Sequence, residues 1–433
     1  MSHHDVVVVG TGLAGLTAAV RLAEDGARVL VVAKGIGATH LSPVTIDVLG
    51  YAPQRVERPV DALGPLLDAR PDHPYRLVGA AGVSAAAAWF KACVRDGPLA
   101  PYAYAGSVEE NLLLPTAVGV LRPSAVVPET MAGGDMRTGG EVCVVGFRAL
   151  KDFHPLLLAD NLSRLGGVTA RAIELDLVPE GRADVNALGF ARAFDDAGFR
   201  AQVTDQLARR LRADERVGLP AVVGLADPHG AWSELQDRLG HTVFEVPTLP
   251  PSVPGMRVFA TMRERLRRAG GRVVLNNVVT GAEHSGGRVS AVRARVGLRD
   301  AVYGADWVVL ATGGFASGGV ELDSRWTGHE TALGLPVAGI PTPGSERFRP
   351  AYLGEQPMGR AGVAVDEEQR PVDAAGARVF DNVLVAGATL AGAEPWREKS
   401  GDGLSLATGH RAAGRILDAS RARARSLTTA SQG

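Results

Sequence analysis

The sequence predicts an α/β protein in which the two ends of the chain build one nucleotide-binding fold around an inserted domain. Three observations lead to this prediction. A β-branched run over residues 5–9 leads directly into a glycine-rich turn and an apolar helix, and two later apolar runs, 306–311 and 382–386, also end in glycine turns. Between the first turn and these later ones the apolar periodicity becomes mixed, so we expect a different fold there.

The first fifty residues have the order strand, glycine turn, helix and strand. Gly10-Thr-Gly12-Leu-Ala-Gly15 follows the first strand without a spacer, and a second buried strand is expected over 28–33. In such a turn Gly10 allows the tight bend, Gly12 lets the backbone approach a pyrophosphate, and Gly15 lets the helix pack closely on the strand. We therefore predict a Rossmann-like FAD/NAD(P)-binding fold with an inserted α+β substrate/cap domain.

The residues after the second strand argue against NAD as the cofactor. An acidic residue for the ribose hydroxyl is expected about 20 residues after the glycine turn, but the strand ends in Ala33-Lys34-Gly35. Lys34 would meet a phosphate or ribose, or would be a solvated lysine at a strand end. The next segment, rich in glycine and hydroxyl residues, is suited to lining a flavin. In it, Ser42 is a candidate ligand, and His40 would hydrogen-bond the cofactor or be structural rather than form a covalent link.

The second half of the chain repeats the pattern of a buried strand followed by glycine. The expected elements are a helix over 256–269 and strands within 271–279, 288–293, 306–311 and 382–386. The last two strands run into Thr312-Gly313-Gly314 and into Gly387. Strands that end in glycine turns are expected where the backbone must approach a ligand or another loop closely.

A further glycine-rich turn lies near the C-terminus. Gly401-Asp402-Gly403 precedes a helix expected from about Leu406 to Leu417. The N-terminal amides of that helix would face the isoalloxazine ring of a flavin; the alternative is an ordinary glycine loop that caps a helix. The predicted cofactor-binding residues are Gly10, Gly12, Gly15, Lys34, His40, Ser42, Thr312, Gly313, Gly314, Gly387, Gly401, Asp402 and Gly403.

The segment between the two nucleotide-binding parts is predicted to be the inserted domain. It has strand-like runs at 141–145 and 168–173 and helical patterns at 187–194 and 199–211. It closes at the proline-rich run 246–255, which we expect to form neither a regular helix nor a central strand but a stiff crossing. The predicted division is 1–85 for the first flavin-binding part, 86–245 for the cap and 246–433 for the second flavin-binding part. The basic tail from about 420 is expected to be frayed and flexible, or to contact a membrane or partner.

Composition excludes several classes of protein. Forty-six Lys and Arg residues against 47 Asp and Glu residues leave no electrostatic footprint for nucleic acid. Two cysteines, Cys93 and Cys143, provide neither a disulfide framework nor four thiolates for a cluster, so we expect a reducing cytoplasm and no metal site. The residues before Val6 show no basic stretch, apolar stretch or cleavage site, so secretion is not expected. The Ala-rich run before Phe90 stops at Lys91, so no membrane-spanning segment is expected and membrane contact would go through a partner.

The three flavin-facing segments, in this order, resemble the fumarate reductase and succinate dehydrogenase flavoprotein superfamily. A narrower resemblance covers nearly the whole chain: several runs are similar to the B subunit of anaerobic glycerol-3-phosphate dehydrogenases. These runs are the proline-rich segment 244–257, Gly218-Leu-Pro-Ala-Val-Val-Gly224, Val145-Gly-Phe-Arg-Ala-Leu-Lys-Asp152-Phe-His-Pro155, Thr39-His40-Leu-Ser42 and Ile46-Asp47-Val-Leu49.

This resemblance implies partners, a substrate and a cofactor. A member of the family pairs with a larger flavoprotein subunit, and it docks on an iron–sulfur, membrane-associated subunit, at the inner face of the membrane. It helps to oxidise sn-glycerol 3-phosphate to dihydroxyacetone phosphate, with quinone as the acceptor. The resemblance implies FMN, whereas the Gly10 to Gly15 loop is built for a dinucleotide such as FAD. The iron–sulfur clusters would lie in another subunit.

Oxidation of a secondary alcohol requires a base for the hydroxyl proton, a flavin to accept the hydride and cations for the phosphate. His329 and Arg257 are the candidates for the base and the phosphate-binding cation. The alternatives are a surface loop histidine and an arginine that forms an ion pair or caps its helix. The histidine-plus-arginines arrangement that fumarate reductases use on dicarboxylates is not recognisable, which disfavours succinate or fumarate.

Two other functions stay open from the sequence. In the first, the chain is a non-catalytic scaffold that keeps the flavin fold to hold its partner, although the intact glycine loops argue against this. In the second, it is a free-standing FAD oxidoreductase that acts on another hydroxy or keto substrate. Residue spacing by itself supports only a flavin-dependent oxidoreductase.

Overall fold

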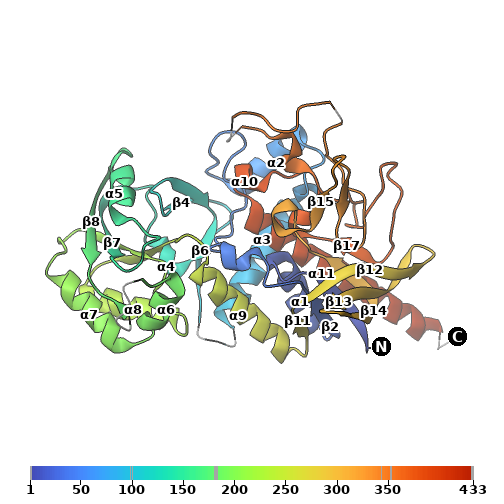
Figure 1. The fold of residues 1–433 in the computed structure, drawn as a ribbon, viewed down its shortest axis with the longest axis horizontal. Coiled ribbons are helices and arrows are strands. Elements are labelled where there is room, and N and C mark those ends of the chain that lie inside the picture. Colours follow the sequence, from blue (N-terminus) through green and yellow to red (C-terminus); the bar gives the residue numbers. More distant parts are fainter. Residues whose placement is uncertain are drawn as a thin grey trace.

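Two lobes lie side by side, and the chain leaves the larger lobe to build the smaller one and then returns (Figure 1). The computed structural model describes residues 2–97, 99, 101–179, 184–342, 344–351 and 354–430. Both ends of the chain lie on the larger lobe, and the smaller lobe comes from the middle of the sequence, drawn from green to yellow in Figure 1. This arrangement agrees with the predicted insertion of one domain into another.

A single sheet organises the larger lobe, with strand order β11-β2-β1-β14-β13-β12 and β17 also paired with β14. Its strands are β1 (Ser2–Val9), β2 (Val29–Val32), β11 (Arg272–Val274), β12 (Asn277–Ser285), β13 (Arg288–Val296), β14 (Arg299–Leu310) and β17 (Val383–Val385). The strands β11, β2, β1, β14 and β17 are parallel. Their carboxyl ends therefore share one edge, where α/β proteins bind ligands.

Alternation of side chains along β1 explains why both faces of this sheet are covered. Val6 and Val8 belong to the core beneath the helices, and Val7 and Val9 belong to the core on the opposite face. All four valines are buried. A strand that is apolar on both sides is typical of a parallel sheet with both faces covered.

Helices cover one face of the main sheet, and loops and short hairpins cover the other. The helices are α1 (Leu13–Glu24), α2 (Pro59–Ala69), α3 (Tyr75–Arg95), α9 (Val253–Arg268), α10 (Pro395–Glu398) and α11 (Gly401–Ala430), and the hairpin is β15 (Val320–Leu322) with β16 (Gly328–Glu330). α11 begins about five residues earlier than expected. It also continues through 420–430, the segment that we expected to be frayed; residues 431–433 lie outside the described part.

Helix α3 corrects the expectation that no segment is long and apolar enough to cross a membrane. In the described part of the chain it is the one helix that meets this test by length and composition, with a mean hydropathy of 1.6, because Lys91 alone does not offset its alanines. Tyr75, Val83 and Phe90 on this helix are buried in the core of the larger lobe. The predicted domain boundary at residue 86 falls inside α3, so the smaller lobe starts further along the chain.

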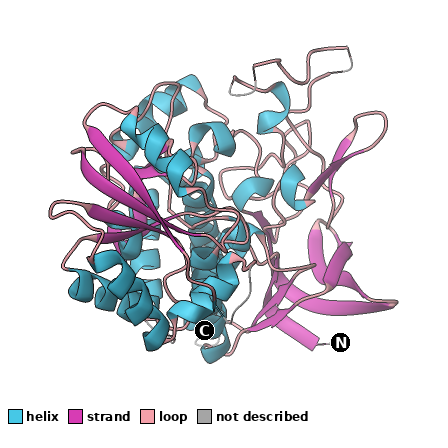
Figure 2. Cartoon of the chain, turned by 60° about the vertical axis from the view of Figure 1, so that its left-hand side comes forward, coloured by secondary structure: helices cyan, strands magenta, loops and turns pink. Residues whose placement is uncertain are grey.

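The smaller lobe contains a second sheet with strand order β10-β9-β7-β8, in which all strands are parallel. Figure 2 shows this sheet among its helices. The elements are β7 (Gly140–Phe147), α5 (Pro155–Ser163), β8 (Val168–Leu175), α6 (Ala187–Phe194), α7 (Ala197–Ala208), β9 (Arg216–Pro220), α8 (Pro228–Leu239) and β10 (Val243–Val246). The runs predicted as strands at 141–145 and 168–173 and as helices at 187–194 and 199–211 are confirmed.

Short antiparallel pairs join the two lobes. They are β3 (Tyr104–Gly106) with β6 (Val126–Pro128) and β4 (Leu112–Pro115) with β5 (Leu121–Ser124), followed by α4 (Glu129–Ala132). Ile46 of the larger lobe also forms an antiparallel bridge with Val126. The loop that follows β2 is therefore hydrogen-bonded directly to this joining region.

The proline-rich crossing is partly helical, contrary to expectation. β10 ends at Val246, and α9 already begins at Val253, with Pro254 in its first turn. Ser252 caps the helix, because its Oγ accepts a hydrogen bond from the Gly255 N–H at 3.2 Å. Proline is tolerated in the first turn of a helix, where its missing N–H has no partner in any case. Only residues 247–252 form the irregular crossing.

Replacement of Gly409 by alanine is expected to destabilise the larger lobe. A Cβ at this position on α11 would lie 2.3 Å from the carbonyl oxygen of Ala14 on α1, so the helices would have to separate, at a cost of about 1–3 kcal/mol. Gly414→Ala is the matched control on the same helix. Its Cβ would meet only the far end of the Arg21 side chain, at 3.1 Å and not the backbone, and alanine gains up to about 1 kcal/mol of helix propensity. Thermal unfolding should show a lower midpoint for Gly409→Ala alone; equal shifts would contradict the packing argument.

Candidate functional site

The glycine turns predicted to bind a cofactor meet at the carboxyl edge of the main sheet. Gly10 has a φ of 113°, and a Cβ on it would lie 2.2 Å from the Ala311 carbonyl oxygen at the end of β14. A Cβ on Gly15 would lie 2.2 Å from the Gly10 carbonyl oxygen. The turn between β1 and α1 therefore packs against the end of β14 at a distance that only glycine allows.

The two later glycine turns lie beside the first. The Gly313 N–H donates to Thr389 Oγ1 at 2.9 Å, and the Gly387 N–H donates to Thr408 Oγ1 on α11 at 2.9 Å. A Cβ on Gly387, which has a φ of 73°, would lie 2.9 Å from the Ala14 Cβ in the first turn of α1. Segments more than 370 residues apart in the sequence thus form one constellation.

The first turn of α1 is suited to an anion. The helix begins after Gly12 with no side-chain cap and no acidic residue in its first turn, so its first amides are not used by a cap of its own. An ideal Cβ on Gly12 meets nothing within 4 Å, which leaves open space in front of these amides. The helix dipole also favours negative charge there, as the pyrophosphate of a dinucleotide requires.

The loop after β2 is held over this turn. Thr11 Oγ1 donates to the Gly35 carbonyl oxygen at 2.7 Å and accepts from the Gly37 N–H at 3.0 Å. Further along, Val44 has a φ of 53°, an outlier for a β-branched residue of the kind that concentrates at functional sites.

Several buried polar atoms of the same loop lack a hydrogen-bond partner within the described protein. They are Thr39 Oγ1, His40 Nε2, Thr45 Oγ1 and Asp47 Oδ1. Buried polar groups are nearly always satisfied, so a cluster of unsatisfied ones at the open face of a nucleotide-binding edge fits a bound polar group. The residues present therefore fit a flavin nucleotide.

Three further predicted ligands, His40, Lys34 and Ser42, lie in three different environments. His40 lies in this loop with its ring edge-on to Phe259, at a centroid distance of 5.0 Å, and burial lowers the pKa of its imidazole. Lys34 is exposed at the end of β2, which agrees equally with the two roles considered for it. Ser42 Oγ donates to Asp402 Oδ2 at 2.5 Å and accepts from the Val44 N–H at 3.0 Å.

Asp402 stands in the first turn of α11, facing the loop after β2. Burial raises the pKa of Asp402 to about 6, against the hydrogen bond from Ser42, and the nearby Asp47 carboxylate adds to the rise. A Cβ on Gly403 would lie 2.5 Å from the Asp47 carbonyl oxygen, and the Gly403 N–H donates to that oxygen at 3.1 Å. The start of α11 is thus tied to the loop that carries the unsatisfied polar atoms.

Glu398 anchors the start of α11 from the other side. This buried carboxylate is hydrogen-bonded by Arg70, by His73 Nε2 at 3.3 Å and by Ser400 Oγ at 2.8 Å. Burial by itself would raise its pKa, but the bond from His73 and the charge of Arg70 lower the pKa of Glu398 to about 2. Glu398 is a structural residue that sequence reasoning missed, because nothing in the sequence shows that loop 70–73 reaches it.

Arg257 does not offer a cation to a phosphate, contrary to the prediction. It is 3% exposed, and its guanidinium is paired with Glu245, with Nη1 to Oε2 at 2.7 Å and Nη2 to Oε1 at 3.0 Å. The remaining N–H groups donate to Tyr102 and to the carbonyl oxygens of Val223 and Gly224. All five donors are used, so the alternative considered for Arg257, a structural ion pair, is correct.

His329 lies on β16, next to a residue that bonds to Thr312 in one of the glycine turns. Its side chain is exposed on β16, whereas the next residue, Glu330, is buried. Glu330 accepts hydrogen bonds from the Ala332 and Leu333 N–H groups at 2.8 and 2.7 Å and from Thr312 Oγ1 at 3.3 Å. The pair of residues therefore points the carboxylate, not the imidazole, towards the predicted turn, and His329 is better described by its surface alternative.

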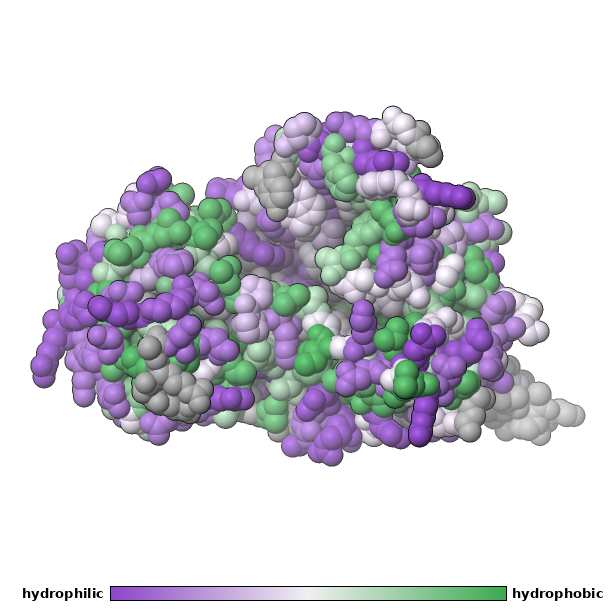
Figure 3. All heavy atoms as spheres, in the orientation of Figure 1, coloured by the Kyte–Doolittle hydropathy of each residue, from purple (hydrophilic) through white to green (hydrophobic). Residues whose placement is uncertain are grey.

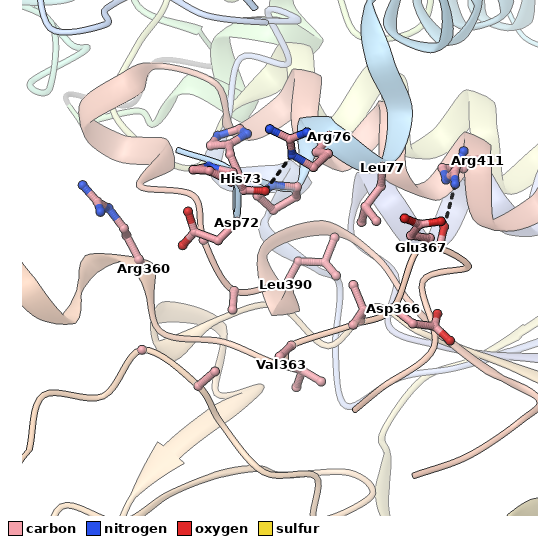
Figure 4. Close-up of a pocket in the computed structure, with 18 of the residues that line it drawn as sticks. Asp72, His73, Arg76, Leu77, Arg360, Val363, Asp366, Glu367, Leu390 and Arg411 are labelled. Carbon is pink, nitrogen blue, oxygen red and sulfur yellow. Dashed lines mark hydrogen bonds between the residues drawn. The ribbon is translucent and has the colours of Figure 1, made fainter. Parts of the chain in front are cut away.

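A cavity of about 690 Å³ lies elsewhere in the larger lobe, between the loop joining α2 to α3, the segment 363–367 and α11 (Figure 4). Arg76 and Arg411 at its wall donate to backbone carbonyl oxygens, those of Pro71 and Glu367, at 2.8 and 2.7 Å. None of the described residues that line it is a predicted cofactor ligand. This cavity is therefore not the predicted flavin site.

The geometry defines a class of protein: a flavin-dependent oxidoreductase whose dinucleotide fold carries an inserted lobe. A family model described as an FAD binding domain matches residues 5–404, and the chain belongs to this family. The match supports FAD, the cofactor that the glycine loop predicts, over the FMN that the resemblance implied.

Comparison with curated relatives narrows the family. The chain is 33% identical over 425 residues to the B subunit of a probable anaerobic glycerol-3-phosphate dehydrogenase of Halobacterium salinarum, covering 94% of this chain and 96% of that protein. It is 31% identical to the B subunit of the anaerobic glycerol-3-phosphate dehydrogenase of Pectobacterium carotovorum, covering 96% and 98%. The chain belongs to the family of these B subunits. The solved 3-ketosteroid Δ1-dehydrogenase of Sterolibacterium denitrificans aligns at 14% identity with a TM-score of 0.48, covering 97% of this chain and 100% of that one.

Substitution of the glycines of the first turn is expected to affect two different properties, FAD affinity for Gly12 and stability for Gly15. Gly12 has φ and ψ of −68° and 176°, which any residue adopts, and its Cβ position is open, so Gly12→Val should leave the unfolding midpoint of the flavin-free protein unchanged. The valine side chain would occupy the place of the pyrophosphate and weaken FAD binding by about 100-fold or more. Gly15→Ala should instead lower the midpoint. Flavin titration and thermal unfolding of both variants test this; loss of stability in Gly12→Val would contradict the assignment.

Arg257→Gln is expected to lower the free energy of unfolding rather than to weaken substrate binding. It would leave the buried Glu245 carboxylate unpaired, which costs about 3–5 kcal/mol of unfolding free energy. A phosphate-binding role would instead raise the KM for substrate and leave stability unchanged. Arg267→Gln, an exposed arginine on the same helix α9, is the control and should leave the unfolding midpoint unchanged. Denaturant unfolding of the two variants separates the two roles.

Proposed function

We propose that this chain is the B subunit of an anaerobic sn-glycerol-3-phosphate:quinone oxidoreductase. In this proposal it takes part in the oxidation of glycerol 3-phosphate to dihydroxyacetone phosphate. It works with a larger flavoprotein subunit, and it passes electrons through an iron–sulfur subunit to quinone, at the inner face of the membrane. The observation that carries the proposal is the convergence of all the predicted glycine turns on one edge, in a chain that matches B subunits over about 95% of its length.

The residues that would hold FAD are those of the constellation. The open first turn of α1 would take the pyrophosphate, and the unsatisfied side chains of Thr39, His40 and Thr45 would bond to the rest of the nucleotide. Bound flavin supplies the two-electron oxidation and the means of passing the electrons on one at a time. The protein has to supply orientation, a proton acceptor and a place for the substrate anion.

Asp402 is the proton acceptor that we propose in place of His329. It lies at the start of α11 among the glycine turns, and its bond from Ser42 fixes the carboxyl group. Its pKa of about 6 is close to neutral pH, where a general base is most effective. His329, by contrast, has an exposed side chain on β16.

Electron transfer out of the chain is proposed to go through a partner. In the part of the chain that the structure describes, no group of three or more His, Cys, Asp or Glu residues is placed to hold a metal ion. The two cysteines are buried, and burial raises the pKa of Cys93 to about 12 and that of Cys143 to about 11, so both are neutral thiols near pH 7. The relatives are named as B subunits, which supports a multi-subunit assembly in which another chain carries the clusters.

An anaerobic spectrum tests the proposal. The purified chain should carry flavin, and chromatography after acid release should identify it as FAD. Bleaching by glycerol 3-phosphate with the isolated chain would show that this chain itself accepts the hydride. Bleaching only in the presence of the larger flavoprotein subunit would make the chain an electron relay. A protein that stays colourless after reconstitution with FAD would overturn the redox proposal.

A pH profile tests Asp402. Because its pKa lies near 6, the carboxylate form is lost below that pH, and kcat/KM should fall about tenfold per pH unit below 6 and level off above it. Asp402→Asn should lower kcat/KM by about 100-fold or more and abolish this limb. Stability gives an independent readout. A raised carboxyl pKa stabilises the fold at low pH, and this contribution is lost as pH rises from about 4 to about 6. The variant should not show that loss.

A further inference from the structure

The joint between the lobes contains a set of charged and polar side chains that border the flavin constellation and share Asp47 and Asp402 with it. Figure 3 shows the molecular surface recessed between the two lobes. Arg122 on β5 reaches across this joint, and its Nε donates to Asp47 Oδ2, in the loop after β2, at 2.6 Å. The Ile46 to Val126 bridge beside it holds the two backbones together. The ion pair is therefore built by both lobes.

Polar atoms at this joint are buried without partners. Asp47 is 1% exposed, and only one of its carboxylate oxygens is bonded to Arg122; the other, Oδ1, has no hydrogen-bond partner in the described protein. Ser124, two residues beyond Arg122 on the same strand, is also 1% exposed, and its Oγ is unsatisfied as well. Two unsatisfied groups of this kind beside a charged pair point to a polar ligand.

Lys399 adds a second cation, whose Nζ uses one of its three N–H groups on the Trp396 carbonyl oxygen, at 2.5 Å. It is not in a helix but between α10 and α11, and its φ of 50° is a left-handed conformation that costs energy for a residue with a side chain. The base of its side chain lies close to Gly50, where a Cβ would be 2.9 Å from the Lys399 Cβ. Burial lowers the pKa of Lys399, and the charge of Arg122 adds to this effect while Asp47 opposes it. The fold therefore keeps Lys399 in a strained backbone conformation and close to a second cation, Arg122.

The balance of charge defines the kind of ligand. Arg122 and Lys399 are matched by Asp47 and Asp402; Arg122 interacts electrostatically with the other three groups, and Asp47 interacts with both Lys399 and Asp402. A plain dianion would be repelled by the carboxylates as much as it is attracted by the cations. A ligand that has an anionic group at one end and hydroxyl donors at the other would match both kinds of side chain.

We propose that this joint is the substrate site, and that it takes a small phosphorylated polyol whose phosphate is held by Arg122 and Lys399 and whose hydroxyl groups bond to Asp47 and Ser124. The inference rests on the proposed function for the identity of the polyol, but not for the chemistry of the site. It makes Arg122 the residue by which the inserted lobe selects the substrate. The hydroxyl end then lies on the side of Asp402, the proposed proton acceptor.

Binding to the FAD-loaded full chain tests this site without turnover. Affinities for glycerol 3-phosphate, glycerol and inorganic phosphate would be measured by calorimetry in oxygen-free buffer, with glycerol 3-phosphate expected to bind most tightly. Arg122→Gln should weaken its binding by between about 10-fold and 100-fold, since a charge-assisted bond is lost. Arg122→Lys should recover part of this, because the charge is kept without the planar fork. Arg164→Gln, an exposed arginine of the smaller lobe, is the control and should change nothing.

Loss of Arg122 also leaves Asp47 buried and unpaired, so a second variant guards against simple misfolding. Arg122→Gln combined with Asp47→Asn removes both charges, and should restore the unfolding midpoint but not the binding. Wild-type affinity in Arg122→Gln, or in this double variant, would overturn the inference, as would a wild-type protein that binds none of the three probes. Failure of the proposed function looks different: Arg122-dependent binding of a phosphorylated polyol would persist, while glycerol 3-phosphate would not bleach the flavin with any partner.

Discussion

The close approach of α1 and α11 at the carboxyl edge of the main sheet is the constraint on which the site depends. A Cβ on Gly409 would lie 2.3 Å from the Ala14 carbonyl oxygen, and one on Gly387 would lie 2.9 Å from the Ala14 side chain. The contact joins the first turn of α1 to Gly409, the ninth residue of α11, so the start of α11 lies about two turns (~12 Å) away from it. The turn before α1 bonds to Gly35 and Gly37 and the start of α11 bonds to Ser42, so the two positive helix ends border one loop, which suits an anionic, electron-accepting nucleotide. Bulkier residues would separate the helices and disperse the loops.

Two arginine–carboxylate pairs connect the lobes, and counting donors separates their roles. Arg257 uses all five N–H groups on protein acceptors and is buried with Glu245, so it can only hold the smaller lobe to α9. Arg122 is about one-third exposed and bonds only one oxygen of Asp47, which leaves capacity on both partners. The sequence does not distinguish the two arginines, but the structure shows that every N–H donor of Arg257 is already hydrogen-bonded within the protein; we call this pair saturated. The saturated pair holds the smaller lobe to α9 and so helps to fix the distance across which Arg122 reaches Asp47.

Local patterns made much of this fold predictable, and long-range contacts account for the rest. The β1–α1–β2 unit and the strands of both lobes follow from periodicity and glycine placement, because these signals are local. The Glu398 contacts, the reach of Arg122 and the burial of Arg257 depend on residues dozens to hundreds of positions away, and no spacing encodes them. The length of the apolar stretch in α3 was underestimated for another reason: one lysine does not outweigh a run of alanines. The early start of α9 was missed because proline breaks a helix in its interior, although the first turn accepts it.

Two carboxylates four residues apart show how the fold divides structure from chemistry. Glu398 and Asp402 flank the start of α11, and burial would raise the pKa of each. Arg70 and His73 reverse this for Glu398 and lower its pKa to about 2, so it stays ionised and holds its loop. Asp402 accepts a hydrogen bond from the Ser42 hydroxyl, but burial and the nearby Asp47 carboxylate outweigh it and raise the pKa of Asp402 to about 6. Environments that separate the pKa values of neighbouring carboxylates in this way let enzymes give one carboxylate a structural role and the other the role of proton acceptor. In the proposed mechanism the α2–α3 loop would act on Asp402 indirectly, because Arg70 and His73 keep Glu398 charged and so hold the start of α11 in place.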